Sequence, residues 1–170
     1  MTSRLAIWRQ RNLLPFGGNL ELDMSILRSG IAGFAAGGTV DLRAFKRAVY
    51  AAARHTDATV VATMPGEIAT PSFHQADVNL AADQISVVCN CWYPVIAFTT
   101  RPVQMAGIVP IDIPAFAEIL RSLGFEVPAA DALSRVLKPA DLEILSDAEQ
   151  GQAKYWKPRR VADVVFNWWD

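Results

Sequence analysis

The sequence is poor in the residues and patterns that identify a chemical function. Only two of its 170 residues are cysteines, Cys89 and Cys91, so no disulfide framework is available. A bond between these two would close a very tight, strained loop. No uncharged apolar run reaches the roughly 18 residues of a membrane-spanning helix, and the first residues include no apolar run of signal-peptide length. We therefore expect a cytoplasmic protein with free thiols and no membrane partner.

Known catalytic and cofactor motifs are also missing. The chain has no Gly-x-Ser-x-Gly, no His-Glu-x-x-His and no phosphate-binding loop, and its glycine-rich stretch 31–38 contains no lysine. A structural zinc site generally needs four ligands in recognisable pairs, and no second cysteine pair accompanies Cys89 and Cys91. We predict no metal site, no cofactor and no catalytic residue.

Two weaker arrangements keep an enzyme as the alternative function. Either cysteine could act as a nucleophile beside a histidine. His74 precedes Asp77 by three residues and His55 precedes Asp57 by two, so either pair could serve acid–base chemistry. These spacings are weak signals, because residues 55–151 contain 12 acidic side chains and some must fall near a histidine. The alternative is a small hydrolase-like enzyme that uses a Cys–His or a His–Asp pair.

The total charge is nearly balanced, but its distribution along the chain is not. The 16 Lys and Arg residues against 17 Asp and Glu give a net charge of -1, so no global field attracts nucleic acid or a membrane. Residues 1–54 carry 8 basic and 3 acidic side chains, whereas residues 55–151 carry 4 basic and 12 acidic ones. Residues 152–170 carry 4 basic and 2 acidic side chains. We expect no nucleic-acid partner.

This division gives two candidate surfaces for binding a protein partner. The first is an acidic group near the end of the acidic segment, made of Asp141, Glu143, Asp147 and Glu149. The second is the basic face of a helix expected over residues 41–54, with Arg43, Lys46 and Arg47. Ordinary solvated helix faces would show the same two patterns, so both interpretations stay open.

The fold prediction rests on hydrophobic periodicity. A length of 170 residues with 52% hydrophobic side chains indicates one globular domain over residues 1–170 with a sizeable core. Period-2 or β-rich patterns predict strands over 20–26, 58–64, 84–90, 93–100 and 109–113. Helical spacing and end signals predict helices over 41–54, 114–123, 129–137, 139–150 and 158–169. Residues 67–83 are mostly polar and are expected to form a long excursion. We predict an α+β fold, an antiparallel sheet packed by several helices, with a helical C-terminal half.

The C-terminus is the least ordinary part of the sequence. Five of the 16 aromatic residues fall within the last sixteen positions. Val161, Val164, Val165 and Trp168 form an i, i+3, i+4, i+7 stripe, which predicts a helix docked on the core by this face. Phe166 and Trp169 cannot both lie on that stripe, so we expect one of them to be exposed or to meet another element.

This ending also carries a resemblance to a known group of proteins. Residues 155–170 read YWKPRRVADVVFNWWD and resemble the closing motif of small bacterial immunity-type proteins of polymorphic toxin systems. The pattern of residues 85–98 is loosely similar as well, so the resemblance covers the chain from about residue 84 onward. It implies a cytosolic binding protein that neutralises a cognate toxin or effector domain by direct protein–protein binding.

The resemblance and the charge pattern lead to a joint expectation. An acidic surface formed by residues 141–149 suits a toxin with a basic active-site cleft, because opposite charges speed association. A nucleic-acid adaptor that uses the basic helix is the third possibility, after the immunity protein and the hydrolase. The sequence gives neither the toxin's activity nor the oligomeric state.

Overall fold

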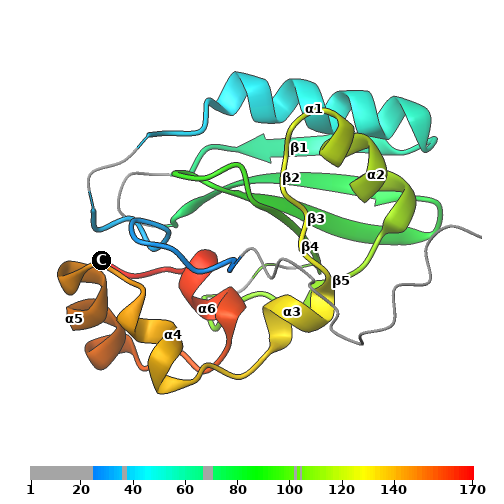
Figure 1. Cartoon of the computed structure of the whole chain (residues 1–170). Coiled ribbons are helices and arrows are strands. Elements are labelled where there is room, and N and C mark those ends of the chain that lie inside the picture. The colour runs from blue at the N-terminus through cyan, green and yellow to red at the C-terminus, as the bar shows by residue number, and fades with distance from the viewer. Residues whose placement is uncertain (1–24, 36–37, 67–70, 102, 104) are drawn as a thin grey trace, which may run out of the picture.

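A five-stranded antiparallel sheet forms the centre of the protein (Figure 1). The computed structural model describes residues 25–35, 38–66, 71–101, 103 and 105–170. The strands lie side by side in chain order: β1 (Thr59–Met64), β2 (Phe73–Leu80), β3 (Asp83–Asn90), β4 (Ile96–Thr100) and β5 (Pro110–Ile111). The helices are α1 (Leu42–His55), α2 (Pro114–Ser122), α3 (Ala130–Ser134), α4 (Pro139–Glu143), α5 (Asp147–Trp156) and α6 (Val161–Val165).

Helices cover both faces of this sheet. Helices α1 and α2 lie on one face, which we call the upper layer (Figure 1). Segment 25–35 and helices α3 to α6 lie on the other face and form the lower layer. Side chains alternate between the two layers along each strand, so Val87 and Cys89 of β3 face upward while Val88 faces downward.

The upper layer is held by an ordinary amphipathic helix. The Asp41 side chain accepts a hydrogen bond from the Arg43 backbone N–H at 3.1 Å and so caps the first turn of α1. Phe45, Val49 and Ala52 recur at helical spacing and are fully buried against the sheet. Gly124 follows α2 with a φ of 91°, a left-handed conformation that ends a helix at little cost.

The lower layer contains short helices and irregular chain, and one buried asparagine joins three of its parts. Asn90 is fully buried at the end of β3. Its side-chain amide donates to the carbonyl oxygens of Ile31 at 2.8 Å and Val165 at 2.7 Å. Its side-chain oxygen accepts from the backbone N–H groups of Trp92 and Tyr93, each at 2.9 Å. Asn90 therefore uses its full hydrogen-bonding capacity to tie segment 25–35 and α6 to the β3–β4 connection.

The C-terminal tail is fixed by a second set of such bonds. The Asn167 amide donates to the carbonyl oxygens of Ala32 and Val164. The backbone N–H of Asn167 donates to the Ser72 hydroxyl, and its carbonyl oxygen accepts from the Ser72 backbone N–H. The tail after α6 is thereby held beside segment 25–35 and the start of β2.

The predicted fold class is confirmed, since the structure is α+β with an antiparallel sheet packed by several helices and a helical C-terminal half. The helix over 41–54, the strand pair around Cys91 and the helix that stops before Gly124 are confirmed as well. The strand expected over 20–26 lies mostly outside the described residues. Within the described part of the chain, no helix is long and apolar enough to cross a bilayer.

The polar excursion expected over 67–83 is wrong, because β2 lies there between β1 and β3. The polar residues of this segment made it resemble a loop, but two of them have partners within the fold. His74 bonds to the backbone carbonyl of Val40, and Asp77 accepts from Ser86 on the lower side of the sheet. The hairpin turn after β2 is formed by Ala81 and the alanine that follows it, without the Asn-Gly or Asp-Gly signal of a tight turn.

The two last predicted helices also differ from the structure. Residues 139–150 do not form one helix. The helical conformation is interrupted after α4, and α5 begins again with Ser146 as its N-cap. The expected helix 158–169 shrinks to α6, which ends at Val165 because Phe166 leaves helical geometry at φ -121° and ψ 71°. This early end lets both Phe166 and Trp169 be buried, while Trp168 is only half-buried.

Candidate protein-interaction site

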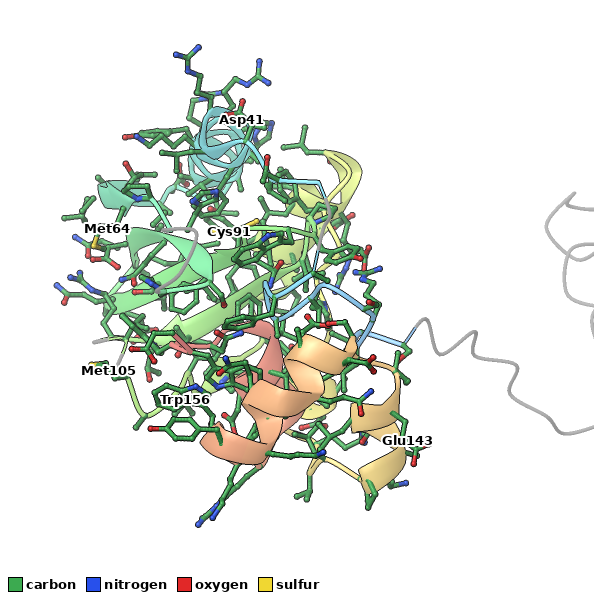
Figure 2. The ribbon with its side chains drawn as sticks, turned by 90° about the vertical axis from the view of Figure 1, so that its left-hand side faces the viewer. Asp41, Met64, Cys91, Met105, Glu143 and Trp156 are labelled. Carbon is green, nitrogen blue, oxygen red and sulfur yellow. The ribbon has the colours of Figure 1, made fainter. Side chains whose placement is uncertain are left out.

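A cavity of about 900 Å³ lies in the lower layer, and we call this cavity the C-terminal cleft. Its wall is formed by residues 105–107, Val136, residues 156–160, Asp163 and residues 166–169. Figure 2 shows the labelled Met105 and Trp156 on the same side of the molecule. The volume falls within the range of ligand-binding pockets, about 300–1,000 Å³, and most of the wall is apolar or aromatic. The cleft therefore has the size and lining of a binding site.

Large apolar side chains gather around this cleft and are exposed to solvent. Met105 is 75% exposed, Val136 69%, Tyr155 76% and Trp156 39%. The Tyr155 ring packs edge-on against Trp156, with ring centroids 5.3 Å apart. Single exposed apolar residues are common, but a group of them around a cavity marks a site of interaction. Trp, Tyr and Met are also residues that protein–protein interfaces favour.

The end of α5 explains why Trp156 is presented at this position. Lys157 adopts a left-handed conformation with φ 52° and ψ 56°, and its backbone N–H donates to the Ala153 carbonyl. Pro158 follows and cannot continue a helix. Trp156 thus occupies the last helical position, and its indole N–H donates to the Gln152 side-chain oxygen at 3.1 Å. The helix end and this hydrogen bond together fix the position of the indole.

The charge at the rim of the cleft is positive. Asp163 is the acidic residue of the wall, and its charge is compensated by the Arg160 guanidinium at 2.8 Å and by the backbone N–H groups of Arg159 and Arg160. The side chains of Lys157 and Arg159 are exposed and make no ion pair with the residues that the structure describes. Two uncompensated cations therefore border the apolar wall.

One polar atom of the wall has no partner. The Trp168 indole Nε1 is buried, and no hydrogen-bond acceptor reaches it from the described residues. The ring packs edge-on against Phe73 with centroids 5.6 Å apart, which fixes its orientation. A buried donor without an acceptor destabilises the protein by about 1–3 kcal/mol. Because this atom has almost no accessible surface, the missing bond is a local cost of the fold and does not by itself mark a ligand contact.

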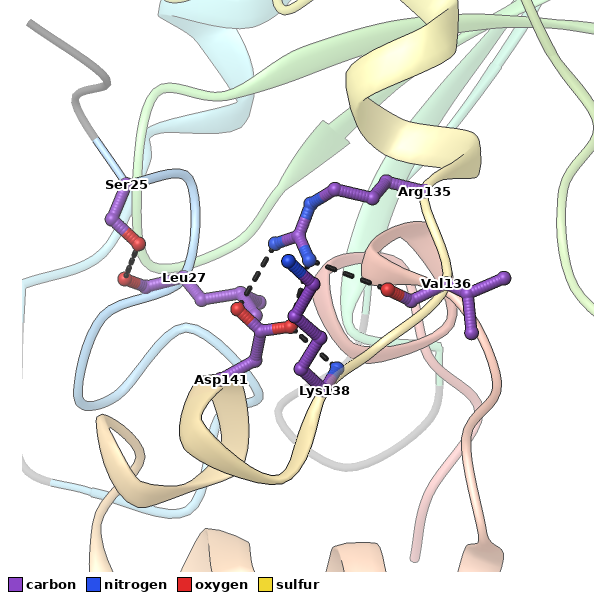
Figure 3. Close-up of polar contacts among 6 residues, drawn as sticks. All are labelled: Ser25, Leu27, Arg135, Val136, Lys138 and Asp141. Carbon is purple, nitrogen blue, oxygen red and sulfur yellow. Dashed lines mark hydrogen bonds and ion pairs between the residues drawn. The ribbon is translucent and has the colours of Figure 1, made fainter.

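The predicted acidic surface is not a continuous one. Asp141 is half-buried and forms a bidentate ion pair with Arg135 at 2.8 and 3.0 Å, and it also accepts from the Lys138 backbone N–H at the start of α4 (Figure 3). The hydrogen bonds from Arg135 hold the pKa of the Asp141 carboxyl below its usual range. Asp141 therefore acts as an internal cap for α4, with its charge already compensated.

Glu149 is not accessible at the surface at all. It is fully buried in α5 and accepts hydrogen bonds from the backbone N–H groups of Gly30 at 2.9 Å, Ala32 at 2.7 Å and Ser146 at 2.9 Å. Its carboxylate joins segment 25–35 to α5 and does not reach the surface. Of the four predicted acidic contacts, only Glu143 and Asp147 are exposed.

The predicted basic surface lies on the opposite side of the sheet. Arg43 and Arg47 are exposed on α1 and Lys46 is half-buried there. Figure 2 shows this arrangement through Asp41 at the start of α1 at the top and Glu143 at the bottom. The acidic and basic sets therefore belong to different layers and do not form one site.

The structure brings Cys91 and His74 together, but not as a nucleophile and its base. The Cys91 sulfur lies 3.9 Å from His74 Nδ1, which already accepts the Gly66 backbone N–H at 2.8 Å, while Nε2 donates to the Val40 carbonyl at 3.0 Å. Burial raises the pKa of the Cys91 thiol to about 11, although the His74 contact lowers it slightly. Burial also raises the pKa of Cys89. Thiols in this state are poor nucleophiles.

The two predicted His–Asp pairs are not formed. His74 faces the upper layer, where it stacks on Phe45, whereas Asp77 faces the lower layer and accepts from Ser86 at 2.6 Å. His55 bonds through Nδ1 to the Ala51 carbonyl of its own helix. In the described part of the chain, no group of three or more His, Cys, Asp or Glu side chains is arranged to hold a metal ion.

Comparison with protein-family models, with curated proteins and with solved structures finds no match to this chain. The site is therefore interpreted from its own residues.

Sequence reasoning did not predict this cleft. The aromatic residues after position 154 stood out in composition, but they were assigned to a helix docked on the core and not to a binding surface. Met105 and Val136 were missed, because each is a lone apolar residue in an irregular segment, with no periodicity to set it apart. Only the tertiary structure brings them beside α5.

Proposed function

We propose that this protein is a cytoplasmic immunity-type protein that neutralises a cognate toxin or effector domain by binding it at the C-terminal cleft. The observation that carries the proposal is the group of exposed apolar side chains, Met105, Val136, Tyr155 and Trp156, around a cavity of about 900 Å³. Such a group resembles the centre of a binding surface, where a few aromatic anchors supply most of the affinity.

A second observation supports the same surface. The residues that carry the resemblance to immunity-type proteins, 155–170, are also the residues that supply most of the cleft wall. Packing alone accounts for the buried members of this motif, such as Phe166 and Trp169. It does not account for Tyr155 and Trp156, which contact solvent and each other. A role in binding a partner explains why this motif includes exposed aromatic residues.

The charge expectation changes with this assignment. Glu149 is buried and Asp141 is paired, so the acidic residues 141–149 offer only Glu143 and Asp147 to a partner. The cleft rim instead carries Lys157 and Arg159. The primary contact is therefore assigned to the cleft, and neither the acidic group nor the basic face of α1 is needed for it.

The test begins with the genes beside this one, and a secreted toxin-like domain encoded there serves as the candidate partner. The two proteins are co-expressed, survival is scored, and binding of the purified proteins is measured by calorimetry. Trp156→Ala should weaken binding by at least about 30-fold and reduce protection, because a central aromatic anchor contributes about 2 kcal/mol or more. Tyr50→Ala is the matched control, since Tyr50 is an exposed aromatic, 47% accessible, on α1. Equal binding by both variants would reject the cleft as the binding surface.

A further inference from the structure

We propose that the C-terminal cleft recognises an acidic segment of the partner protein, which places an apolar side chain in the cavity and its carboxylates at Lys157 and Arg159. This inference rests on the proposed function and names the chemistry of the partner. It reverses the earlier expectation that the protein presents an acidic surface to a basic toxin cleft.

The first argument is the charge that the cleft leaves unused. Asp163 is compensated from within by Arg160 and by two backbone N–H groups, so it does not cancel Lys157 or Arg159. Both side chains are exposed and unpaired among the described residues, at the border of an apolar wall. A carboxylate that binds at this border interacts more strongly with the two cations than it would in open water, because the neighbouring apolar surface excludes water from the contact.

The second argument is the aromatic wall of the cavity. Trp156 and Trp168 line it, and the Trp168 ring is held edge-on against Phe73. Tryptophan is among the residues that anchor protein–protein contacts, because its large ring buries much apolar area. The segment that binds here therefore carries an apolar side chain between its carboxylates.

The third argument is the shape of the charged region. The cations of the cleft border one compact cavity, whereas a nucleic acid requires phosphate contacts spread along an extended stripe. Basic side chains follow one another along α1, on the opposite face of the sheet, at Arg43, Lys46 and Arg47. An acidic peptide segment with one apolar anchor fits a compact, aromatic-lined cavity better than a nucleic-acid strand does.

The indole N–H signals of the full-length protein provide a direct readout. The 15N-labelled protein is titrated with a capped hexapeptide that has Leu-Phe at its centre and two acidic residues on each side. Two further probes are the same peptide with amides in place of the acids, and a short single-stranded oligonucleotide. The acidic peptide should shift the Trp156 and Trp168 indole signals and bind at least about tenfold more tightly than the amide peptide. Added salt should weaken this binding.

Charge variants then locate the contact. Lys157→Glu/Arg159→Glu should bind the acidic peptide no better than the amide peptide, and Lys157→Gln/Arg159→Gln should fall in between. Arg43→Glu/Arg47→Glu is the matched control with the same charge change on α1, and it should bind as the wild type does. Equal binding of the two peptides, no binding of the acidic peptide, or stronger binding of the oligonucleotide at the same indole signals would overturn the inference.

The same variants separate this inference from the proposed function. If Trp156→Ala loses toxin binding but Lys157→Glu/Arg159→Glu keeps it, the cleft is the binding surface, and the inference that it recognises an acidic segment is wrong. If toxin binding survives Trp156→Ala while the acidic peptide still binds the cleft, the proposed function fails and the peptide specificity stands.

Discussion

The two layers that cover the sheet are held by different combinations of contacts. In the upper layer, α1 is a 14-residue helix that buries an apolar stripe against β2, β3 and β4. In the lower layer, α3, α4 and α6 have five residues each. Helices this short have little stability of their own, so other contacts must fix them. Both layers bury an apolar cluster against the sheet, and the comparison shows that the lower layer adds specific polar connections to its apolar packing.

The polar connections of the lower layer follow from its irregular backbone. Segment 25–35 and the tail after α6 include buried residues, such as Ile31, Ala32 and Phe166, that belong to no helix or strand. Buried backbone N–H and C=O groups need partners wherever secondary structure does not supply them. Asn90, Asn167 and Glu149 supply these partners from neighbouring elements. The wall of the C-terminal cleft belongs to this polar-connected layer, which holds Trp168 in position.

The sharpest test of this difference replaces one buried residue in each layer with leucine. Asn90→Leu keeps the branching at Cγ, although leucine is larger, and removes the partners of four backbone groups, so the free energy of unfolding should fall by at least about 4 kcal/mol. Phe45→Leu in α1 exchanges one apolar side chain for another and should lower it by about 1 kcal/mol. Urea unfolding at neutral pH measures both values. Similar losses for the two variants would show that the layers do not differ in this way.

A second test addresses the carboxylate that joins segment 25–35 to α5. Glu149→Gln keeps the shape but turns one acceptor oxygen into a donor that faces a backbone N–H, so unfolding free energy should fall by about 2–3 kcal/mol. Hydrogen exchange should accelerate at Gly30 and Ala32, whose N–H groups bond to Glu149, and stay slow in β3. Unchanged exchange at these two amides would mean that Glu149 does not hold the segment.

The same contrast explains how much of the fold could be predicted from sequence. The helix over 41–54 and the strands around Cys91 were predicted because apolar periodicity records burial directly. The lower layer was predicted less well, because its short helices are fixed by long-range bonds such as that between Glu149 and Gly30, 119 residues apart. Glu149 resembles a solvated helix residue in sequence, and only the tertiary structure reveals that it is a buried acceptor.

The candidate site was not predicted from the sequence, for the same reason. Aromatic density after position 154 was visible, but composition does not distinguish the buried Phe166 from the exposed Tyr155. That distinction depends on where α6 ends. Charge counting along the chain was a poor guide, since Asp141 and Glu149 are both compensated inside the protein.

The smallest expected effect concerns the Asp141–Arg135 ion pair, which caps α4 at the edge of the lower layer. Its partners are partly exposed, with 17% of the Asp141 side chain and 43% of the Arg135 side chain accessible, so solvent screens the interaction. Asp141→Asn should therefore lower the free energy of unfolding at pH 7 by less than about 1 kcal/mol.

The pH dependence of this loss has a definite sign. The folded protein holds the pKa of Asp141 below its usual value of about 3.9, chiefly through the hydrogen bonds from Arg135. The stabilisation is thus fully present above that usual value and is lost as the pH falls through the lowered pKa. The difference in unfolding free energy between wild type and Asp141→Asn should accordingly shrink and vanish in acid.

Glu143→Gln on the same helix is the control, because Glu143 is exposed and forms no ion pair with a described residue. It should differ little from wild type both at pH 7 and in acid. A gap for Asp141→Asn that persists unchanged into acid would assign its effect to the uncharged cap of α4 instead of the ion pair.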